Sequence, residues 1–367
     1  MAEVALRPNL LLQVIVSGTH LSKEHGETWQ EIAADGFPID ARVEMQLTND
    51  DTESITASAA LALAGTGQAL ARLNPDVLVL LGDRYELLAA AQAAMLARVP
   101  IAHIHGGEAT EGAIDEAIRH AVTKLARWHF PAAEPYAERI RQMGEAASRI
   151  WNVGAPAMDN IAALDPVPQH ELEAFLGITL RTPSLLVTYH PVTLESDGGL
   201  PAVQELLEAL ESFAGTTIIT GTNADPGAKA IRSTLQAFAQ ANPDQVVLVE
   251  SLGAKRYLSL MRCVDAVVGN SSSGILEAPA IGVPTVDIGS RQQGRLRAPS
   301  VIHCGETATE IRKALQKAVS PTHRALAAQR DTPYGQPGAA QRIVDVLQSI
   351  ETHVQGKKFI DRHCSPD

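Results

Sequence analysis

Short apolar runs that end in small or polar residues alternate with helical patterns along the chain. The run 77–81 (VLVLL) passes into Gly-Asp-Arg, and the run 184–189 (SLLVTY) passes into His-Pro. Largely apolar runs of this length are typical of parallel strands that are buried on both faces of a sheet. An Ala/Leu-rich helical stretch follows the first run up to about residue 97. This alternation predicts an α/β fold, with parallel sheets that carry helices on both faces.

The same pattern occurs in both halves of the chain. Strands are expected at 10–16, 77–81, 99–105, 127–130 and 150–153, and again at 184–189, 216–220, 246–249, 266–268 and 285–288. The segment 164–170 (LDPVPQH) carries two prolines and little apolar signal, so it is the expected boundary. We therefore predict two Rossmann-like domains, residues 1–166 and 167–367, that face each other across a cleft. In such open sheets, ligands bind outside the carboxyl ends of the strands.

The composition excludes several classes of protein. The 367 residues suffice for two domains at about 100–200 residues each. The formal charge of -12 disfavours nucleic-acid and membrane partners, so an anionic ligand needs a local site. Cys263, Cys304 and Cys364 have neither metal-ligand spacing nor a disulfide pattern. Because we find no signal peptide and no apolar run of about 18 residues, we expect a cytoplasmic protein.

A Gly- and Ser-rich loop in the second half is a candidate anion site. The loop 269–274 (GNSSSG) follows the expected strand 266–268 and precedes a helical stretch that contains Glu277. Small residues let a ligand approach the backbone, and a helix N-terminus offers unpaired N–H groups to a phosphate. The alternative is a capped turn without a ligand. Glu277 is either a capping carboxylate or an acceptor for the hydroxyls of a ribose.

Basic and polar residues follow other strands of the second half. Arg291, Arg295 and Arg297 come after the last expected strand, where they suggest a clamp for a diphosphate. His190 directly follows its strand and can donate a hydrogen bond to a phosphate. Asn223 comes soon after another strand and is a candidate for the same ligand. The alternatives are a solvated basic loop and an ordinary loop histidine.

Charged residues also follow two strands of the first half. Asp83 comes after one strand, and His105 and Glu108 come at the end of the next. Asp115 and Arg119 are four residues apart, so they share one face of a helix, where a surface ion pair is the alternative reading. Carboxylates with a nearby histidine and arginine suit proton transfer at a carbon together with expulsion of an anionic leaving group.

A metal site is not predicted in this half. Alternation along the strand 99–105 would place His103 and His105 on one face, as a pair of metal ligands requires. No carboxylate or third histidine has the spacing of a known site.

Taken together, these strings resemble the hydrolysing UDP-N-acetylglucosamine 2-epimerases, and the branch of the sialic and legionaminic acid pathways is the most similar. The strings are GDRYE at 82–86, HIHGGE at 103–108, DEAIRH at 115–120, HP at 190–191, GNSSSG at 269–274 and GSRQQGR at 289–295. The resemblance extends from about residue 8 to about residue 301. It implies a GT-B-like arrangement of two Rossmann-like domains with the nucleotide sugar in the cleft.

The resemblance also implies a reaction in two stages. UDP is eliminated across C1 and C2 of the sugar to give a glycal, and water then adds to C1 with the opposite configuration at C2. No redox or metal cofactor is implied. The expected partners are a UDP-sugar substrate and a second copy of the chain in a homodimer.

The matching motifs assign roles to residues of this sequence. The catalytic candidates are Asp83, His105, Glu108, Asp115, Arg119 and His190. The candidates for binding UDP are His190, Asn223, Asn270, Ser271, Ser272, Gly274, Glu277 and Arg291, with Glu277 on the ribose. Other branches of the family carry a glutamate at the position of His105, so the choice of base among His105, Glu108 and Asp115 stays open.

The N-terminus departs from the family pattern. The family opens with a strand and a Gly-Thr/Ser-Arg loop before its first helix, whereas residues 3–7 match only the end of that helix. We therefore expect the first sheet to lack a central strand. Our hypothesis is that the true start lies upstream, or that this is a truncated copy.

The substrate is open at this level. UDP-N-acetylglucosamine would give N-acetylmannosamine for nonulosonic (sialic-type) acid biosynthesis. The small, apolar loop 112–114 would also suit UDP-2,4-diacetamido-2,4,6-trideoxyglucose of the legionaminic acid pathway, and a GDP donor is a further alternative. The other hypotheses are a GT-B glycosyltransferase and a non-catalytic nucleotide-sugar-binding protein.

Overall fold

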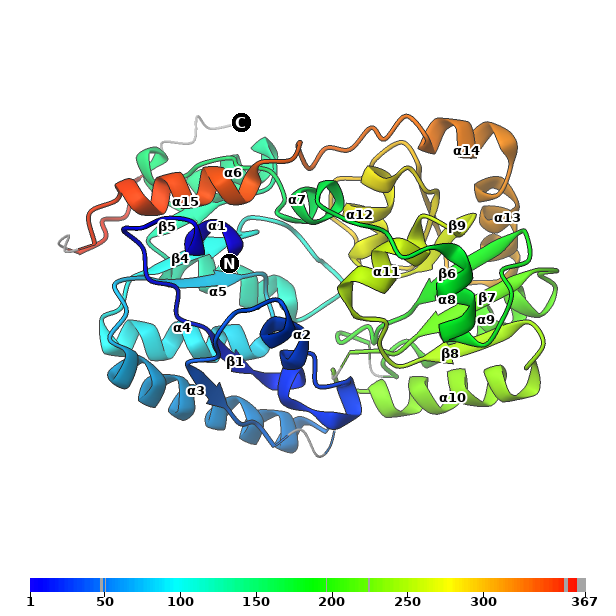
Figure 1. Cartoon of the computed structure of the whole chain (residues 1–367), viewed down its shortest axis with the longest axis horizontal. Coiled ribbons are helices and arrows are strands. Elements are labelled where there is room, and N and C mark those ends of the chain that lie inside the picture. Colours follow the sequence, from blue (N-terminus) through cyan, green and yellow to red (C-terminus); the bar gives the residue numbers. More distant parts are fainter. Residues whose placement is uncertain (47–48, 50, 196, 224, 353–355, 362–367) are drawn as a thin grey trace.

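The chain forms two α/β halves that lie side by side (Figure 1). The computed structural model describes residues 1–46, 49, 51–195, 197–223, 225–352 and 356–361. Within this part of the chain, every ladder between strands is parallel, as the sequence predicts.

The second half is built on one six-stranded sheet with the strand order β11-β10-β9-β6-β7-β8. Its strands are β6 (Ser184–Thr188), β7 (Thr216–Thr220), β8 (Val246–Val249), β9 (Ala266–Gly269), β10 (Thr285–Ile288) and β11 (Val301–Cys304). One face packs against α9 (Leu200–Glu211), α10 (Ala228–Ala241) and α13 (Ala308–Ala318). The other face packs against α8 (Gln169–Leu176), α11 (Gly253–Met261) and α12 (Ser273–Ile281), and α14 (Pro321–Ala327) follows α13. The middle residues of β6, β7 and β9 are buried aliphatic residues, because both faces of the sheet are covered.

The first half contains two smaller sheets. β1 (Ile15–Ser17) pairs with β2 (Ala41–Val43), and β3 (Leu78–Leu81), β4 (Ile101–Ile104) and β5 (Trp128–Phe130) form a second sheet. The main helices are α3 (Thr52–Leu73), α4 (Tyr85–Ala97) and α5 (Asp115–Leu125), which share one apolar cluster with β3 and β4. The shorter helices are α1 (Ala2–Ala5), α2 (Trp29–Ala34), α6 (Glu134–Gln142) and α7 (Ala157–Ala162).

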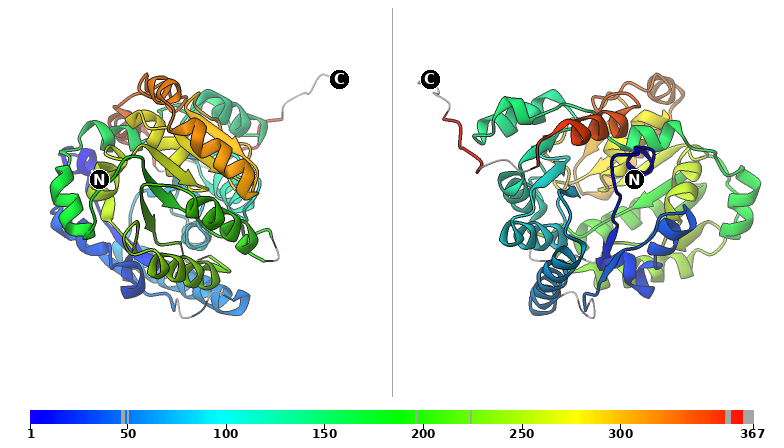
Figure 2. Two further views of the ribbon diagram at one scale, coloured as in Figure 1. Left: turned by 90° about the vertical axis from the view of Figure 1, so that its right-hand side faces the viewer. Right: turned by 60° about the vertical axis from the view of Figure 1, so that its left-hand side comes forward.

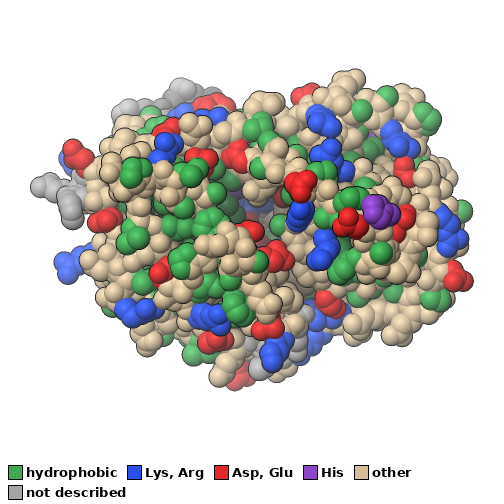
Figure 3. All heavy atoms as spheres, in the orientation of Figure 1, with side chains coloured by type: hydrophobic (Ala, Val, Ile, Leu, Met, Phe, Trp, Pro, Cys, Tyr) green, Lys and Arg blue, Asp and Glu red, His purple; other side chains and the backbone are tan. Residues whose placement is uncertain are grey.

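The sheet of the first half is interrupted between β1 and β3. Among the described residues, β1 pairs only with β2 and β3 pairs only with β4. Val79 and Leu81 of β3 are 43% and 54% exposed, which is unusual for aliphatic residues of a strand in an α/β half. No described strand joins the two sheets, and the missing central strand stays a prediction. In Figure 3, hydrophobic side chains gather on the visible face of the first half.

Most strand predictions agree with the structure, and the differences have physical reasons. The expected strand 10–16 shortens to Ile15–Ser17, because β2 is its only partner and residues 10–14 join no ladder. The expected strand 150–153 makes a single bridge, from Ile150 to His129. β2 and β11 were not predicted, since β2 has three residues and β11 is a half-exposed edge strand with a polar His303.

The last helix returns to the first half of the molecule. α15 (Ala339–Ser349) lies against the first half in Figures 1 and 2, and Ile343 packs with Ala102 and Phe130. The carboxylate of Asp159 in α7 accepts a hydrogen bond from the backbone N–H of Ala340 at 2.6 Å. No helix in the described part of the chain is long and apolar enough to cross a bilayer.

Beyond α15, the chain reaches a buried carboxylate of the first half. Glu145 is 2% exposed, and its carboxylate lies 2.6 Å from Lys124 Nζ, 2.8 Å from Lys357 Nζ and 3.1 Å from His129 Nε2. Burial alone would raise the pKa of Glu145, but these donors outweigh burial and lower it to about 2. Because the pKa is depressed, the contribution of Glu145 to stability is complete above its ordinary value of 4.5 and is lost as the pH falls toward 2.

Lys357→Met is expected to lower the free energy of unfolding by about 1–3 kcal/mol, because the buried carboxylate of Glu145 would lose one charged partner. Lys358→Met at the exposed neighbouring position is the matched control and should change stability by less than about 0.5 kcal/mol. Urea unfolding followed by circular dichroism measures both. Equal destabilisation by the two substitutions would contradict the role of Lys357.

Candidate active site

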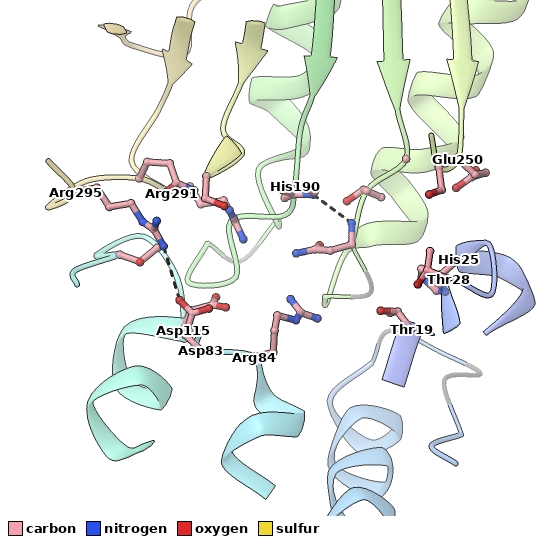
Figure 4. Close-up of a pocket in the computed structure, with 17 residues that line it drawn as sticks. Thr19, His25, Thr28, Asp83, Arg84, Asp115, His190, Glu250, Arg291 and Arg295 are labelled. Atoms are coloured by element: carbon pink, nitrogen blue, oxygen red, sulfur yellow. Dashed lines mark hydrogen bonds and ion pairs between the residues drawn. The ribbon is translucent and has the colours of Figure 1, made fainter. Parts of the chain in front are cut away.

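A cavity of about 400 Å³ lies between the two halves (Figure 4). Six of the residues given roles by the matching motifs line it, three from turns after strands of the second half, one from the N-terminus of α12 and two from the first half: His190, Asn223, Arg291, Ser272, Asp83 and Asp115. Arg295, from the expected diphosphate clamp, lines it too. The other predicted residues, His105, Glu108, Arg119, Asn270, Ser271, Gly274 and Glu277, do not line it. Glu108, Arg119 and Asn270 contact residues that do.

Asp83 is oriented by a buried arginine. Arg119 is 1% exposed, and its guanidinium forms an ion pair with the carboxylate of Asp83. It also donates to the carbonyl oxygen of Glu108 at 3.1 Å and to Oγ1 of Thr110 at 2.7 Å. Asp115 and Arg119 were expected to share a helix face, but the partner of Arg119 in the structure is Asp83. The ion pair therefore fixes the orientation of the Asp83 carboxylate at the edge of the cavity.

Glu108 is held between a histidine and an arginine. Its side chain is 1% exposed, one oxygen contacts Nδ1 of His105, and the other lies 3.0 Å from Nη1 of Arg295. Burial would raise the pKa of Glu108, but Arg295 and His105 together outweigh burial and lower it. Arg295 belongs to the second half, so this ion pair joins the two halves. Glu108 is therefore suited to holding the site together.

His103 and His105 do not form a metal pair. β4 ends at Ile104, and His105 has a left-handed φ of 64°, so its side chain leaves the alternation of the strand. His103 is buried and contacts Oγ1 of Thr123 and the carbonyl oxygen of Gly82. Burial lowers the pKa of His103 to about 4. In the described part of the chain, no three His, Cys, Asp or Glu residues are placed to hold a metal ion.

Asp115 is the first residue of α5 and is 6% exposed. Burial raises the pKa of Asp115, against the opposing effect of Arg291. A carboxyl group with a raised pKa can carry a proton nearer to neutral pH, as a general acid must.

The loop before Asp115 is fixed by contacts with the second half. The N–H of Ile114 donates to Oγ1 of Thr193 at 3.0 Å. A Cβ at Gly112 would come within 2.8 Å of the Cα of Arg291, so glycine permits the close approach of the two loops. These contacts place Asp115 opposite the arginine.

His190 is clamped at the end of β6 by Asn270. Oδ1 of Asn270 accepts from the N–H of His190 at 2.7 Å, and Nδ2 donates to its carbonyl oxygen at 2.8 Å. The N–H of Asn223 donates to Nδ1 of His190 at 3.2 Å, so the proton of the neutral ring is assigned to Nε2. Burial and the charge of Arg291 lower the pKa of His190 to about 3. His190 can thus donate a hydrogen bond but carries no charge near neutral pH.

The N-terminus of α12 faces the cavity beside an arginine. Ser272 precedes this helix of nine residues, and Oγ1 of Thr285 donates to the carbonyl oxygen of Gly274 at 2.7 Å. A Cβ at Gly274 would come within 2.8 Å of Thr285, so glycine lets the helix pack on β10. Arg291 is 7% exposed and donates to the carbonyl oxygens of Pro191 and Asn270, both at 3.2 Å. The helix N-terminus and a fixed guanidinium together suit a phosphate group.

Glu277 lies one turn into α12 and is half-buried. Burial raises its pKa to about 7, although His105 and Arg295 oppose the shift. Its contact with a ribose stays a prediction.

Two charged residues of the site, Arg84 and Asp225, were not assigned roles from the sequence, and Arg295 has other partners than expected. Arg84, next to Asp83, lines the cavity and lies 2.6 Å from Asp225 of the second half. Arg295, which was grouped with Arg291, instead reaches the carboxylates of the first half. The sequence feature that could have identified Arg84 and Asp225 is their position just after strands, in the strings GDR (82–84) and NAD (223–225). Their pairing joins segments 141 residues apart, which local sequence patterns do not reveal.

The chain is similar to known proteins over most of its length. A protein of Campylobacter jejuni described as GDP/UDP-N,N'-diacetylbacillosamine 2-epimerase (hydrolyzing) is 39% identical over 301 residues, which cover 82% of this chain and 78% of the relative. The UDP-N,N'-diacetylbacillosamine 2-epimerase (hydrolyzing) of Legionella pneumophila is 33% identical over 94% of this chain and 89% of its own. The solved UDP-GlcNAc 2-epimerase of Neisseria meningitidis, bound to UDP-GlcNAc, shares the fold with a TM-score of 0.79 at 18% identity, and the match covers 95% of each chain.

The family model described as UDP-N-acetylglucosamine 2-epimerase matches residues 2–348. The likeness to the solved structure also bears out the GT-B-like arrangement predicted from the sequence. The chain therefore belongs to the UDP-N-acetylglucosamine 2-epimerase family.

Proposed function

We propose that this protein is a hydrolysing 2-epimerase that acts on a UDP-activated 2-acetamido sugar. The observation that carries the proposal is the division of the cavity between the halves. The second half supplies the N-terminus of α12, Arg291 and neutral His190, which suit a diphosphate leaving group. The first half supplies two carboxylates, Asp83 and Asp115, which suit proton transfer at the sugar.

The two carboxylates differ in a way that separates acid from base. Asp83 is paired with the guanidinium of Arg119, whereas Asp115 is buried and burial raises its pKa, which favours its protonated form. We assign Asp83 as the base that takes the proton from C2 and Asp115 as the acid that returns a proton to the opposite face. This assignment differs from the sequence-based choice of base among His105, Glu108 and Asp115. Glu108 and His105 are paired with each other outside the cavity lining, and Asp115 takes the role of the acid.

The reaction then proceeds in two steps. The C2 proton passes to Asp83, the bond between C1 and the phosphate oxygen breaks, and its electron pair leaves with UDP while a C1=C2 double bond forms. His190 Nε2–H, Arg291 and the helix N-terminus stabilise the departing diphosphate. Asp115 then protonates C2 of the glycal, and water adds its hydroxyl to C1 and gives its proton to the Asp115 carboxylate. The product is a free sugar with inverted configuration at C2.

Two substrates remain in consideration. UDP-2,4-diacetamido-2,4,6-trideoxyglucose is supported by the names of the Campylobacter and Legionella relatives and by the small, apolar loop 112–114. UDP-N-acetylglucosamine, the first expectation from the sequence, is supported by the description of the family. We propose the diacetamido sugar as the preferred substrate.

Incubation with each UDP-sugar alone tests both proposals. We expect UDP and a free sugar with inverted configuration at C2. The sugar should carry one deuterium at C2 when the reaction runs in D₂O, and solvent oxygen at C1 when it runs in H₂¹⁸O. The kcat/KM should be at least about tenfold higher for the diacetamido sugar, a difference of about 1.4 kcal/mol. NMR and mass spectrometry measure the products, and the GDP-sugars are run in parallel. Turnover of UDP-N-acetylglucosamine alone would contradict the preference, and release of UDP only with an added acceptor would indicate a glycosyltransferase.

Substitution of the two carboxylates separates the steps. Asp83→Asn is expected to abolish exchange of the C2 proton and to lower kcat by at least about 100-fold. Asp115→Asn should instead release the glycal and UDP, because elimination continues while protonation of C2 fails. Both variants should bind UDP within a few-fold of the wild type. Asp76→Asn, at an exposed position of the same half, is the control; absence of glycal with Asp115→Asn would contradict the assignment of the acid.

A further inference from the structure

A buried carboxylate lies among the cations that suit the diphosphate. Asp225, in the turn after β7, is 3% exposed, and its Oδ1 lies 2.6 Å from Nη1 of Arg84. Its Oδ2 accepts from Nδ2 of Asn223 and lies 4.0 Å from Nη2 of Arg291. Arg84 comes from the N-terminus of α4 in the first half, so the pair crosses the cleft. In Figure 4, Arg84 extends from α4 toward His190.

The charges of this cluster nearly cancel. Arg84 and Arg291 carry two positive charges, and the facing carboxylates are Asp225 and Glu86, at 2.6 Å and 3.7 Å from Arg84, whereas Asp115, assigned as the acid, carries a proton. His190 adds no charge, because burial and Arg291 lower its pKa to about 3. A bound diphosphate would add negative charge to this buried, nearly neutral cluster. Binding of that charge is unfavourable while Asp225 remains paired with Arg84.

We propose that Asp225 is an internal counter-ion that holds Arg84 until a nucleoside diphosphate binds and competes with the diphosphate for that guanidinium. The proposal rests on the proposed function, since it needs a diphosphate in the cleft. Asp225 is then a positioning residue that acts through Arg84. By weakening the hold on UDP, it favours departure of that product after each turnover.

A purely structural pair would behave differently. If Asp225 only fastened the halves together, its removal would loosen the cleft and weaken UDP binding. A counter-ion predicts the opposite sign, because removal of the carboxylate frees Arg84 for the diphosphate. The sign of the change in UDP affinity therefore distinguishes the two roles.

The test uses the full chain and UDP itself as the probe, with binding measured by calorimetry. Asp225→Asn is expected to bind UDP about tenfold more tightly, which is about 1.4 kcal/mol, and to lower KM and kcat together because UDP leaves more slowly. Asp225→Ala is a second variant, and circular dichroism checks the folding of both. In the double variant Arg84→Met/Asp225→Asn, the gain in affinity should disappear.

Asp287→Asn is the matched control, because Asp287 is a buried carboxylate of the same half that is paired with Arg297 and does not line the cavity. It should leave the affinity for UDP unchanged. If folded Asp225 variants bind UDP as tightly as the wild type or more weakly, the inference is overturned but the proposed function is not. A wild-type chain that binds neither UDP nor GDP would overturn the proposed function, and the inference with it.

Discussion

The ion pair between Arg295 and Glu108 is the contact on which the geometry of the site depends. It joins the two halves through side chains that are 8% and 1% exposed, and it fixes the loop that leads to α5. The N–H of Glu111 donates to the carbonyl oxygen of Gln293 at 3.1 Å on the same border. Buried charges tolerate desolvation only when they are paired, so this arrangement leaves little freedom to either loop. The placement of Asp115 opposite Arg291 follows from it.

The electrostatics of the site are local and differ from the overall charge of -12. Arg84, Arg291 and Arg295 come from two halves of the chain and meet in one cleft, each compensated by a carboxylate. His190 contributes hydrogen-bonding capacity without charge. An acidic protein can hold an anionic substrate in this way, since the potential at a buried point depends on its neighbours more than on distant surface groups.

The sequence predicts those features that follow from local patterns. β7, β8 and β10 match the expected strands residue for residue, because continuous apolar runs with clear ends identify buried parallel strands. The six lining residues were found because they directly follow strands or open a helix. The roles of Glu108 and Asp115 could not be separated, since their difference arises from burial and from Arg295 in the other half. The orientation of the His105 side chain could not be predicted either, because a single residue with a left-handed φ breaks the alternation of its strand.

The return of α15 to the first half has a mechanical consequence. The chain passes from one half to the other twice, once after α7 and once before α15, and the two passages lie side by side. The N–H of Ala155 donates to the carbonyl oxygen of Tyr334 at 2.9 Å, and Asp159 accepts from the backbone at the start of α15. Two adjoining covalent connections resist twisting and sliding, but they permit bending about their common line. Bending about this line would therefore keep the groups that face each other across the cleft in the same register.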